Sequence, residues 1–329
     1  MEMIKSPPDV LFVPSHSIPL VHPPQTVTTV HDVVFLKYPE LYDPEDLKNQ
    51  LRSFNFAKQF AKKIIVPSKA TRDDVVANGV DAERVVVVEH GVNNDFSESL
   101  TNIQAPESPN SSESYRIIRK IRDNSDIREN RFVLFIGRIE KKKNVMNLVH
   151  AFRKLIDAGK ANNESTRMNE YQADSHIRSH SLFGSIKLVL AGSKGYGAED
   201  VDLAIKTFKL EDRVIQLGWV DRDQYYSLLK NATLLVFPSF GEGFGLPVLE
   251  AMSIGVPVVC SDISVLHEVG GNAVEYVNPH NPKDIARGII TVLDNEMLQS
   301  EMIKRGKVRA GEYTWEKSAK STWKILTGL

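Results

Sequence analysis

The second half of the chain alternates short β-rich runs with segments of helical periodicity. Strands are predicted at 132–136, 186–190, 214–217, 234–237, 257–260 and 273–277. Helices are predicted between and beside them at 144–158, 198–209, 222–230, 246–254 and 263–269, and further on at 282–293 and 296–309. This alternation favours an α/β fold, in which helices cover both faces of a parallel sheet. Ligands of such folds bind beyond the carboxyl ends of the strands.

The first half shows a similar but shorter pattern. Strands are predicted at 26–30, 64–66 and 85–88, with 10–13 as one further candidate. A helix is predicted over 45–61, because Leu47, Leu51, Phe54 and Ala61 recur at roughly helical spacing. The first half of the chain is therefore predicted to form an α/β unit of its own, ahead of the one in the second half.

The length of 329 residues suits roughly two domains. We predict an N-terminal domain over 1–96, a linker over 97–130 with a helix at 115–122, a C-terminal domain over 131–312, and a last helix within 313–329. Residues 159–184 are polar without an apolar period, which indicates a surface insertion. His176 and His180 lie four residues apart in it, and a solvated loop explains them better than a metal site does.

The composition excludes several classes of protein. A hydrophobic share of 42% and a charged share of 25% are ordinary for a globular chain, and a net charge of −1 gives no indication of nucleic-acid binding. The single cysteine, Cys260, excludes an intramolecular disulfide and fits a reducing compartment; its apolar run predicts a buried, inert thiol. No apolar run approaches the roughly 18 residues that span a bilayer, and no signal peptide is visible. These features predict a cytoplasmic protein.

The run from Phe237 to Glu250 (FPSFGEGFGLPVLE) places two carboxylates, Glu242 and Glu250, on either side of a glycine-rich turn. A predicted strand precedes the turn and a helix follows it, an arrangement that presents backbone N–H groups to an anion. No residue with a capping side chain stands near Gly245, so the first N–H groups of this helix are expected to lack a side-chain partner.

This run resembles the E-x7-E signature of the family-4 retaining glycosyltransferases (glycosyl transferases group 1), down to Glu-Gly-Phe-Gly-Leu-Pro. The resemblance implies the GT-B fold, in which two Rossmann-like, doubly wound parallel-sheet domains face a cleft. It also implies that Glu242 orients the sugar or stabilises its developing positive charge, and that Glu250 holds the ribose. The donor-binding residues implied in the turn are Gly243, Phe244, Gly245 and Leu246. A dehydrogenase is a weaker alternative, since the turn reads G-x-G-x-G and lies late in the chain.

A second motif, Phe135 to Asn144 (FIGRIEKKKN), follows the first strand of the second domain. Fixed cations in a partly dry cleft stabilise the charge that develops on a departing diphosphate. The motif is similar to the family's G-R-x-x-x-x-K-N element, which implies that Gly137 lines the donor and that Arg138 and Lys143 contact the diphosphate. A basic surface loop is the alternative.

Three weaker elements complete the predicted site. The pair His31-Asp32 follows a strand and is similar to a His-Asp pair of the family whose histidine contacts the donor sugar; a histidine fixed by a local carboxylate is the structural alternative. Gly192 and Lys194 lie in a glycine-rich loop that the resemblance places near the nucleotide or sugar. Gly218 ends the next strand, where the family holds the base through backbone groups.

The resemblance covers the chain from about Val10 onward, with two departures. Members of the family begin with further strands and a glycine-rich loop, whereas 30 residues precede His31 here, so the first domain is expected to be incomplete at its N-terminus, with exposed sheet edges. Leu266-His267-Glu268 stands where the family often has Leu-Pro-Glu. Basic residues at Arg52, Lys58, Lys62 and Lys63 could favour an anionic membrane surface, but a solvated helix face is the favoured interpretation.

The resemblance therefore implies an enzyme, a retaining hexosyltransferase that moves a sugar from a nucleotide-diphosphate sugar to a saccharide or lipid-linked acceptor. Mannose is the preferred sugar, and cell-surface polysaccharide or glycoconjugate assembly is the expected context, in the cytoplasm or peripherally on the inner face of the membrane. No metal or other cofactor is implied, because Arg138 and Lys143 supply the positive charge. The alternative hypothesis is a non-catalytic half-enzyme that binds a nucleotide sugar and needs a missing N-terminal part.

Overall fold

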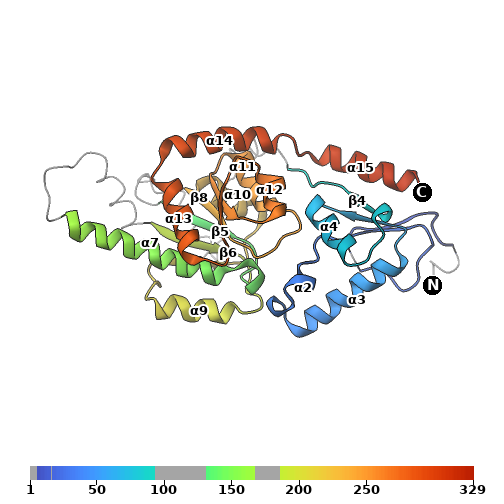
Figure 1. Cartoon of the computed structure of the whole chain (residues 1–329), viewed down its shortest axis with the longest axis horizontal. Coiled ribbons are helices and arrows are strands. Elements are labelled where there is room, and N and C mark those ends of the chain that lie inside the picture. The colour runs from blue at the N-terminus through green and yellow to red at the C-terminus, as the bar shows by residue number, and fades with distance from the viewer. Residues whose placement is uncertain (1–5, 16, 93–130, 167–185) are drawn as a thin grey trace, which may run out of the picture.

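The computed structural model describes residues 6–15, 17–92, 131–166 and 186–329. Two parallel sheets form two α/β domains side by side, as predicted (Figure 1). The predicted linker with its helix at 115–122, and the pair His176 and His180, lie outside the described residues.

The first sheet has four parallel strands in the order β1-β2-β3-β4. They are β1 (Leu11–Val13), β2 (Thr26–Thr29), β3 (Lys63–Val66) and β4 (Val85–Val87). The predicted helix is α3 (Pro44–Phe60), which starts at a side-chain cap where Asp43 accepts hydrogen bonds from the N–H groups of Glu45 and Asp46. Two further helices were not predicted, α2 (Val34–Lys37) and α4 (Lys69–Ala77). The sequence of α4 shows no clear apolar periodicity, because the only buried residues of this helix are Thr71 and Val75.

The second sheet has six parallel strands in the order β10-β9-β8-β5-β6-β7. They are β5 (Phe132–Ile136), β6 (Lys187–Ala191), β7 (Val214–Gly218), β8 (Leu234–Phe237), β9 (Val258–Ser261) and β10 (Glu275–Val277). The helices are α7 (Val145–Thr166), α9 (Ala198–Thr207), α10 (Arg222–Asn231), α11 (Leu246–Ile254), α12 (Ser264–Gly270), α13 (Pro282–Leu293) and α14 (Glu296–Ala310). The central strands are buried on both faces, which explains their continuous apolar runs.

Helices cover both faces of this sheet. One hydrophobic cluster packs α7, α9 and α13 against it, and a second cluster packs α10, α11 and α12 against it. Cys260 is fully buried in β9, as predicted, and burial raises the pKa of its thiol.

The surface insertion was predicted to begin at residue 159, but α7 continues to Thr166. Polarity alone does not end a helix, because the helix satisfies its backbone hydrogen bonds internally. Gly159 within a helix costs only about 1 kcal/mol relative to alanine.

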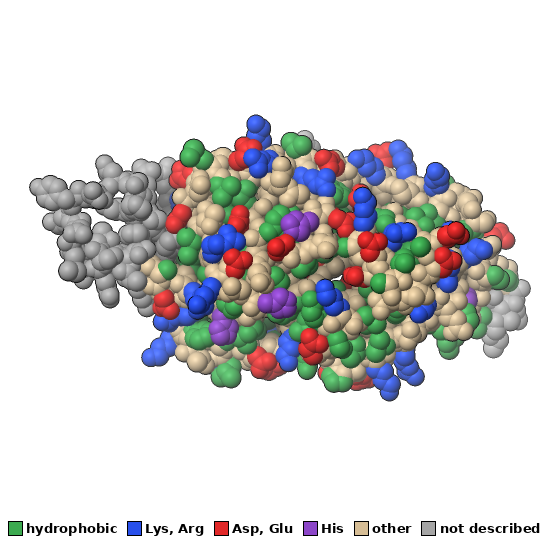
Figure 2. All heavy atoms as spheres, viewed as in Figure 1, with side chains coloured by type: hydrophobic (Ala, Val, Ile, Leu, Met, Phe, Trp, Pro, Cys, Tyr) green, Lys and Arg blue, Asp and Glu red, His purple; other side chains and the backbone are tan. Residues whose placement is uncertain are grey.

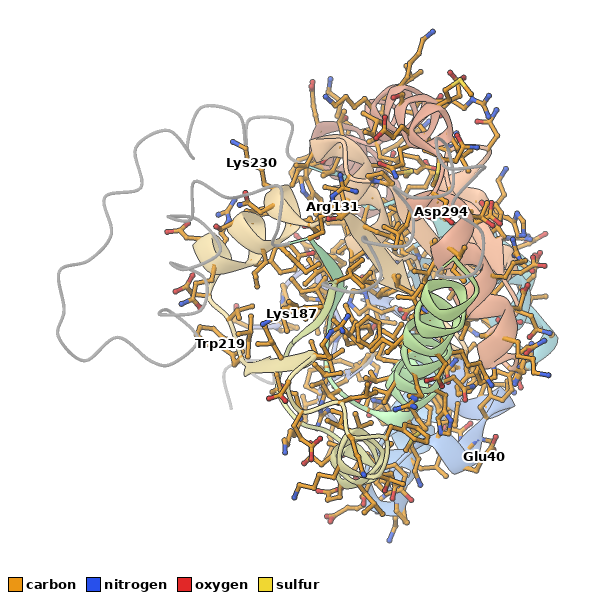
Figure 3. All side chains as sticks on the ribbon, turned by 90° about the vertical axis from the view of Figure 1, so that its left-hand side faces the viewer. Glu40, Arg131, Lys187, Trp219, Lys230 and Asp294 are labelled. Carbon is orange, nitrogen blue, oxygen red and sulfur yellow. The ribbon has the colours of Figure 1, made fainter. Side chains whose placement is uncertain are left out.

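The carboxyl ends of the second sheet face the first domain. Figure 3 looks at the end of the molecule that lies farthest from the first domain, and it shows Arg131, just before β5, and Lys187, the first residue of β6. Lys142, which follows β5, pairs with Asp32, which follows β2 of the first domain. From the first domain, Ser68, which follows β3, reaches Gly243 of the second domain. The carboxyl ends of the strands of the first sheet and those of the second sheet therefore face each other across the domain boundary.

The last helix, α15 (Trp315–Thr327), extends over the first domain (Figure 1). Its Ile325 and Leu326 pack with Val27, Ile65 and Val88 of the first domain. Among the helices that the structure describes, none is both long and apolar enough to cross a membrane.

Candidate active site

The turn between β8 and α11 begins its helix as expected. Gly245 is the N-cap residue, in a left-handed conformation with φ of 101°, and no side chain bonds to the first turn. Pro247 occupies the first helical turn, where its missing N–H removes one donor that would lack an intrahelical partner. The helix end therefore presents positive dipole charge without a side-chain acceptor of its own.

Gly243 in this turn lies directly against the first domain. A Cβ atom at Gly243 would stand 1.7 Å from the backbone oxygen of His31, so no other residue fits without movement. The Gly243 carbonyl faces two hydroxyl groups of the first domain, with Ser68 Oγ at 2.8 Å and Thr71 Oγ1 at 3.1 Å. Ser68 and Thr71 are 1% and 3% exposed. This contact fixes the predicted catalytic turn to the opposite domain.

Three successive lysines after β5 reach three different partners. Residues 141–143 form a short 3-10 helix, in which neighbouring side chains point about 120° apart. Lys141 lies over the ring of Tyr196. Lys142 Nζ lies 3.4 Å from Asp32 of the first domain, and Lys143 Nζ donates to Glu242 at 2.6 Å. The geometry of the turn thus separates three residues that the sequence presents alike.

The contact between Lys143 and Glu242 joins two residues that were predicted as catalytic from separate motifs. Their side chains are 17% and 10% exposed. Opposite charges that are mostly removed from water interact more strongly than a surface pair does. The structure therefore holds a nearly buried, neutralised ion pair beside the N-terminus of α11.

Lys142 forms another ion pair, and this one crosses the domain boundary to Asp32. The sequence did not predict it. Burial would lower the pKa of Lys142, but Asp32 and Tyr42 outweigh it, and the net shift is upward. The ammonium also lies over the ring of Tyr42, at 5.4 Å. Lys142 therefore stays charged and links the two domains next to the Lys143–Glu242 pair.

His31 lies at the domain boundary but is not fixed by Asp32. Its Nε2 lies 3.1 Å from the carbonyl oxygen of Pro14, while Asp32 accepts a hydrogen bond from the N–H of Val34 and faces Lys142. A histidine held in place by the neighbouring carboxylate is therefore not what the structure shows. The His31 ring is exposed and lies 5.8 Å from that of His90.

His90 in turn packs on Phe244 of the predicted turn, with ring centroids 5.1 Å apart. Burial lowers the pKa of His90 to about 4, and the nearby His31 adds to this shift. Phe244 is 5% exposed, so this ring forms part of the core beneath the turn.

A row of three glycines lies at the carboxyl ends of β5, β6 and β7. The N–H of Gly137 donates to Ala191 O at 2.9 Å, and the N–H of Gly192 donates to Gly218 O at 2.7 Å. A Cβ at Gly192 would stand 1.9 Å from Gly137 O, and φ of 150° there also favours glycine. The predicted glycines thus form one continuous backbone surface at the sheet edge.

Arg138 and Lys194 are directed at acidic side chains of their own domain. Arg138 Nε lies 3.7 Å from Glu140, and its side chain is 55% exposed. Lys194 donates to Asp202 on α9. The structure therefore leaves Arg138 accessible at the end of β5, and pairs Lys194 with a carboxylate.

Glu250, on the second turn of α11, is held by two tyrosines of α10. The hydroxyl of Tyr225 donates to one carboxylate oxygen, and that of Tyr226 donates to the other at 3.2 Å. Burial raises the pKa of Glu250, and the two tyrosine bonds oppose this shift only in part. No pattern in the sequence indicated this contact, because it joins two helices.

Two other residues that the sequence left without a role organise the site. Asn144, 2% exposed and left-handed with φ of 60°, donates to the carbonyls of Pro238 and Pro279, so it ties together the loops after β8 and β10. Glu268 accepts hydrogen bonds from the N–H groups of Lys69 and Ala70, at 2.8 and 2.6 Å, so it caps α4 across the domain boundary. In the sequence, Asn144 was visible only as the last residue of the second motif, and Glu268 only as the last residue of Leu266-His267-Glu268.

A cavity of about 200 Å³ lies between the domains and is lined by Glu242. A larger one of about 500 Å³ lies beside it. Within the described parts of the chain, no group of three or more histidine, cysteine or acidic residues is placed to hold a metal ion.

Comparison with known proteins agrees with the geometry. The model of the family glycosyl transferases group 1 matches residues 117–309, and that of glycosyltransferase family 4 matches residues 2–96. The chain is 27% identical over 299 residues to the O-antigen chain mannosyltransferase B of Escherichia coli, which covers 91% of this chain and 69% of that protein. It is 26% identical over 328 residues to the serotype-specific mannosyltransferase WbdA of Escherichia coli, but spans only 36% of that relative's length.

Among solved structures, the HepE protein of Anabaena in complex with UDP and glucose superimposes with a TM-score of 0.67 at 20% identity. The match covers 92% of this chain and 72% of HepE. This likeness confirms the predicted GT-B architecture of two facing α/β domains.

Proposed function

Since the chain belongs to the glycosyl transferases group 1 family, we propose that it transfers a sugar from a nucleotide-diphosphate sugar to a saccharide or lipid-linked acceptor, with retention of configuration. The observation that carries the proposal is the contact between Lys143 and Glu242 beside the uncapped start of α11. It joins a cation for a diphosphate and a carboxylate for a sugar in one place.

The positive groups of the site suit a diphosphate leaving group. Lys143 and the accessible Arg138 follow β5, and the N-terminus of α11 adds N–H groups. In the structure, Glu242 neutralises Lys143. A diphosphate that pairs with Lys143 would replace that carboxylate and leave Glu242 available to the sugar. Charge that develops on the leaving group is then stabilised by cations that are already positioned.

The proposed step balances without a metal or redox partner. The acceptor hydroxyl oxygen forms a bond to the anomeric carbon on the face from which the diphosphate leaves. The bond between that carbon and the phosphate oxygen breaks with its electron pair going to the phosphate, which takes up the hydroxyl proton. Glu242 stabilises the positive charge that develops on the sugar ring.

The nucleotide would lie along the glycine row and α11. Gly218 leaves open space beside its backbone, since a Cβ there would meet no atom within 4 Å, and Glu250, oriented by Tyr225 and Tyr226, would accept hydrogen bonds from ribose hydroxyls. The names of the relatives favour mannose as the sugar and O-antigen-like polysaccharide assembly as the context. Contact with a membrane surface stays a prediction.

A thermal-shift panel of UDP, GDP and ADP with their common sugar conjugates tests the donor site. A nucleotide at about 100 times its Kd should stabilise the folded chain by roughly 2.7 kcal/mol. A shift with one base identifies the donor, and its mannose conjugate should then be turned over. Absence of any shift would contradict the proposal.

Variants test the roles within the site. Glu242→Ala and Lys143→Ala should each lower turnover by more than roughly tenfold, the effect of losing one transition-state contact. Lys141→Ala is the matched control, because it removes a neighbouring lysine that contacts Tyr196 instead. Normal rates in both site variants would refute the assignment. Nucleotide binding without turnover in the wild-type chain would favour the half-enzyme.

A further inference from the structure

The larger of the two cavities lies beside the region where the nucleotide is expected, and none of the predicted donor-binding residues lines it. Of the predicted donor contacts, Gly137 and Gly192 follow β5 and β6, Gly218 ends β7, and Gly243 to Leu246 and Glu250 follow β8. The cavity of about 500 Å³ lies at the carboxyl ends of β8, β9 and β10, away from the glycine row. Its walls include Lys37, Tyr38, Phe240, Asp262, His267 and His280.

This cavity leads to the proposed reaction centre. The smaller cavity, of about 200 Å³, shares Lys37, Tyr38 and Phe240 with it and is also lined by Glu242. Both domains contribute walls, because Tyr38 ends α2 and Phe240 follows β8. A molecule in the larger cavity can therefore extend towards the Glu242 carboxylate.

The walls combine aromatic faces with partly exposed polar groups. The rings of His280 and Phe240 lie 4.9 Å apart and tilted by 31°. His267 and Asp262 are hydrogen-bonded at 2.6 Å, yet their side chains remain 49% and 63% exposed, so each keeps bonding capacity towards the cavity. Figure 2 shows histidine side chains near the middle of the molecule and an intermixed surface of acidic and basic groups.

A sugar ring suits these walls better than an anion does. The ring offers C–H groups on its faces, which match aromatic surfaces, and hydroxyl groups around its rim, which both donate and accept. A diphosphate would require several fixed cations, but Lys37 is the only lysine or arginine lining the described cavity, and the Asp262 carboxylate opposes it. The volume lies within the range of roughly 300–1,000 Å³ that small-molecule sites have.

We propose that this cavity binds the acceptor saccharide and directs its hydroxyl group to the reaction centre beside Glu242. The inference rests on the proposed function, because it assigns the second substrate of that reaction. The nucleotide sugar would lie along the glycine row and the start of α11, the acceptor would lie beyond the ends of β9 and β10, and the loop that carries Phe240 and Glu242 would separate them.

Saturation-transfer NMR on the full chain tests the assignment without turnover. The probes are methyl α-mannoside, methyl α-glucoside and methyl α-N-acetylglucosaminide. At least one should bind the wild-type chain, and Asp262→Ala and His280→Ala should each weaken that binding at least fivefold. Ser264→Trp places a large side chain at an exposed position that lines both cavities and should abolish it. His150→Ala is the matched control, since His150 also packs on a phenylalanine, 4.8 Å from Phe208, but on α7.

The outcomes separate this inference from the proposed function. The nucleotide thermal shift should stay unchanged in Ser264→Trp, which also shows that the variant is folded. Absence of binding by all three probes, or equal binding to the wild type and Ser264→Trp, would overturn the acceptor site even if a nucleotide binds. Displacement of the bound probe by inorganic pyrophosphate would show an anion site and would also overturn it. Sugar binding without any nucleotide shift would instead count against the proposed donor.

Discussion

The hydroxyl groups of Ser68 and Thr71 should set how firmly the catalytic turn is attached to the first domain. Both reach the buried carbonyl of Gly243, at 2.8 and 3.1 Å. The two hydroxyls also lie 3.0 Å apart, but they carry only two protons, so both can serve the carbonyl only if neither donates to the other. Ser68 in addition caps α4 by accepting from the N–H of Thr71.

These contacts give a magnitude for each variant. Thr71→Val removes one hydrogen bond with little change of shape, which should lower the free energy of unfolding by about 1 kcal/mol. Ser68→Ala removes one hydrogen bond and a helix cap, each worth about 1 kcal/mol, so the loss should be about 2 kcal/mol. The double variant leaves the Gly243 carbonyl buried without a donor, a penalty of about 1–3 kcal/mol. Its loss should therefore exceed the sum of the single losses.

Urea unfolding of the four proteins in this double-mutant cycle measures the coupling. Thr71→Ser keeps the hydroxyl and should stay close to the wild type, while Thr207→Val deletes a hydroxyl that bonds to Leu203 O within an exposed helix and should change little. Because Gly243 adjoins Glu242, the double variant should also lose turnover. Additive losses below about 0.5 kcal/mol each would refute the argument that the carbonyl needs these donors.

Three further perturbations follow from the site. Tyr225→Phe removes one hydrogen bond to Glu250 and should weaken nucleotide binding about fivefold, a loss of about 1 kcal/mol, by calorimetry; unchanged affinity would contradict a ribose role for Glu250. Lys142→Met leaves Asp32 mostly buried without its cation and should destabilise the fold by about 1–3 kcal/mol, with Lys142→Arg as the conservative control. Burial lowers the pKa of His90 in the folded chain to about 4. Between pH 6.5 and 4 the unfolded chain therefore binds more protons than the folded chain, and the free energy of unfolding decreases as the pH is lowered, by up to about 1.4 kcal/mol per pH unit. His90→Gln should flatten this part of the unfolding curve, and an unchanged slope would show that other groups cause it.

The sequence by itself determined the elements and the local start of the site. Strands buried on both faces need continuous apolar runs, and such a run predicted β5 and β8 at the observed residues. The start of α11 at Leu246 also followed from local chemistry, since Gly245 and Pro247 fit the backbone conformations that a helix start requires. Helix α4 was missed because its apolar period is short, and the polar end of α7 was taken for a loop.

Only the tertiary structure decided which polar groups meet. Lys142 and Lys143 are adjacent residues of the same type, yet the 3-10 turn directs one to Asp32 of the other domain and the other to Glu242. The contacts of Gly243 with Ser68 and of Glu250 with Tyr225 join elements that no periodicity relates. The physical reason is that periodicity reports only which face of an element is buried, whereas the choice of partner across a domain boundary depends on how the complete sheets dock.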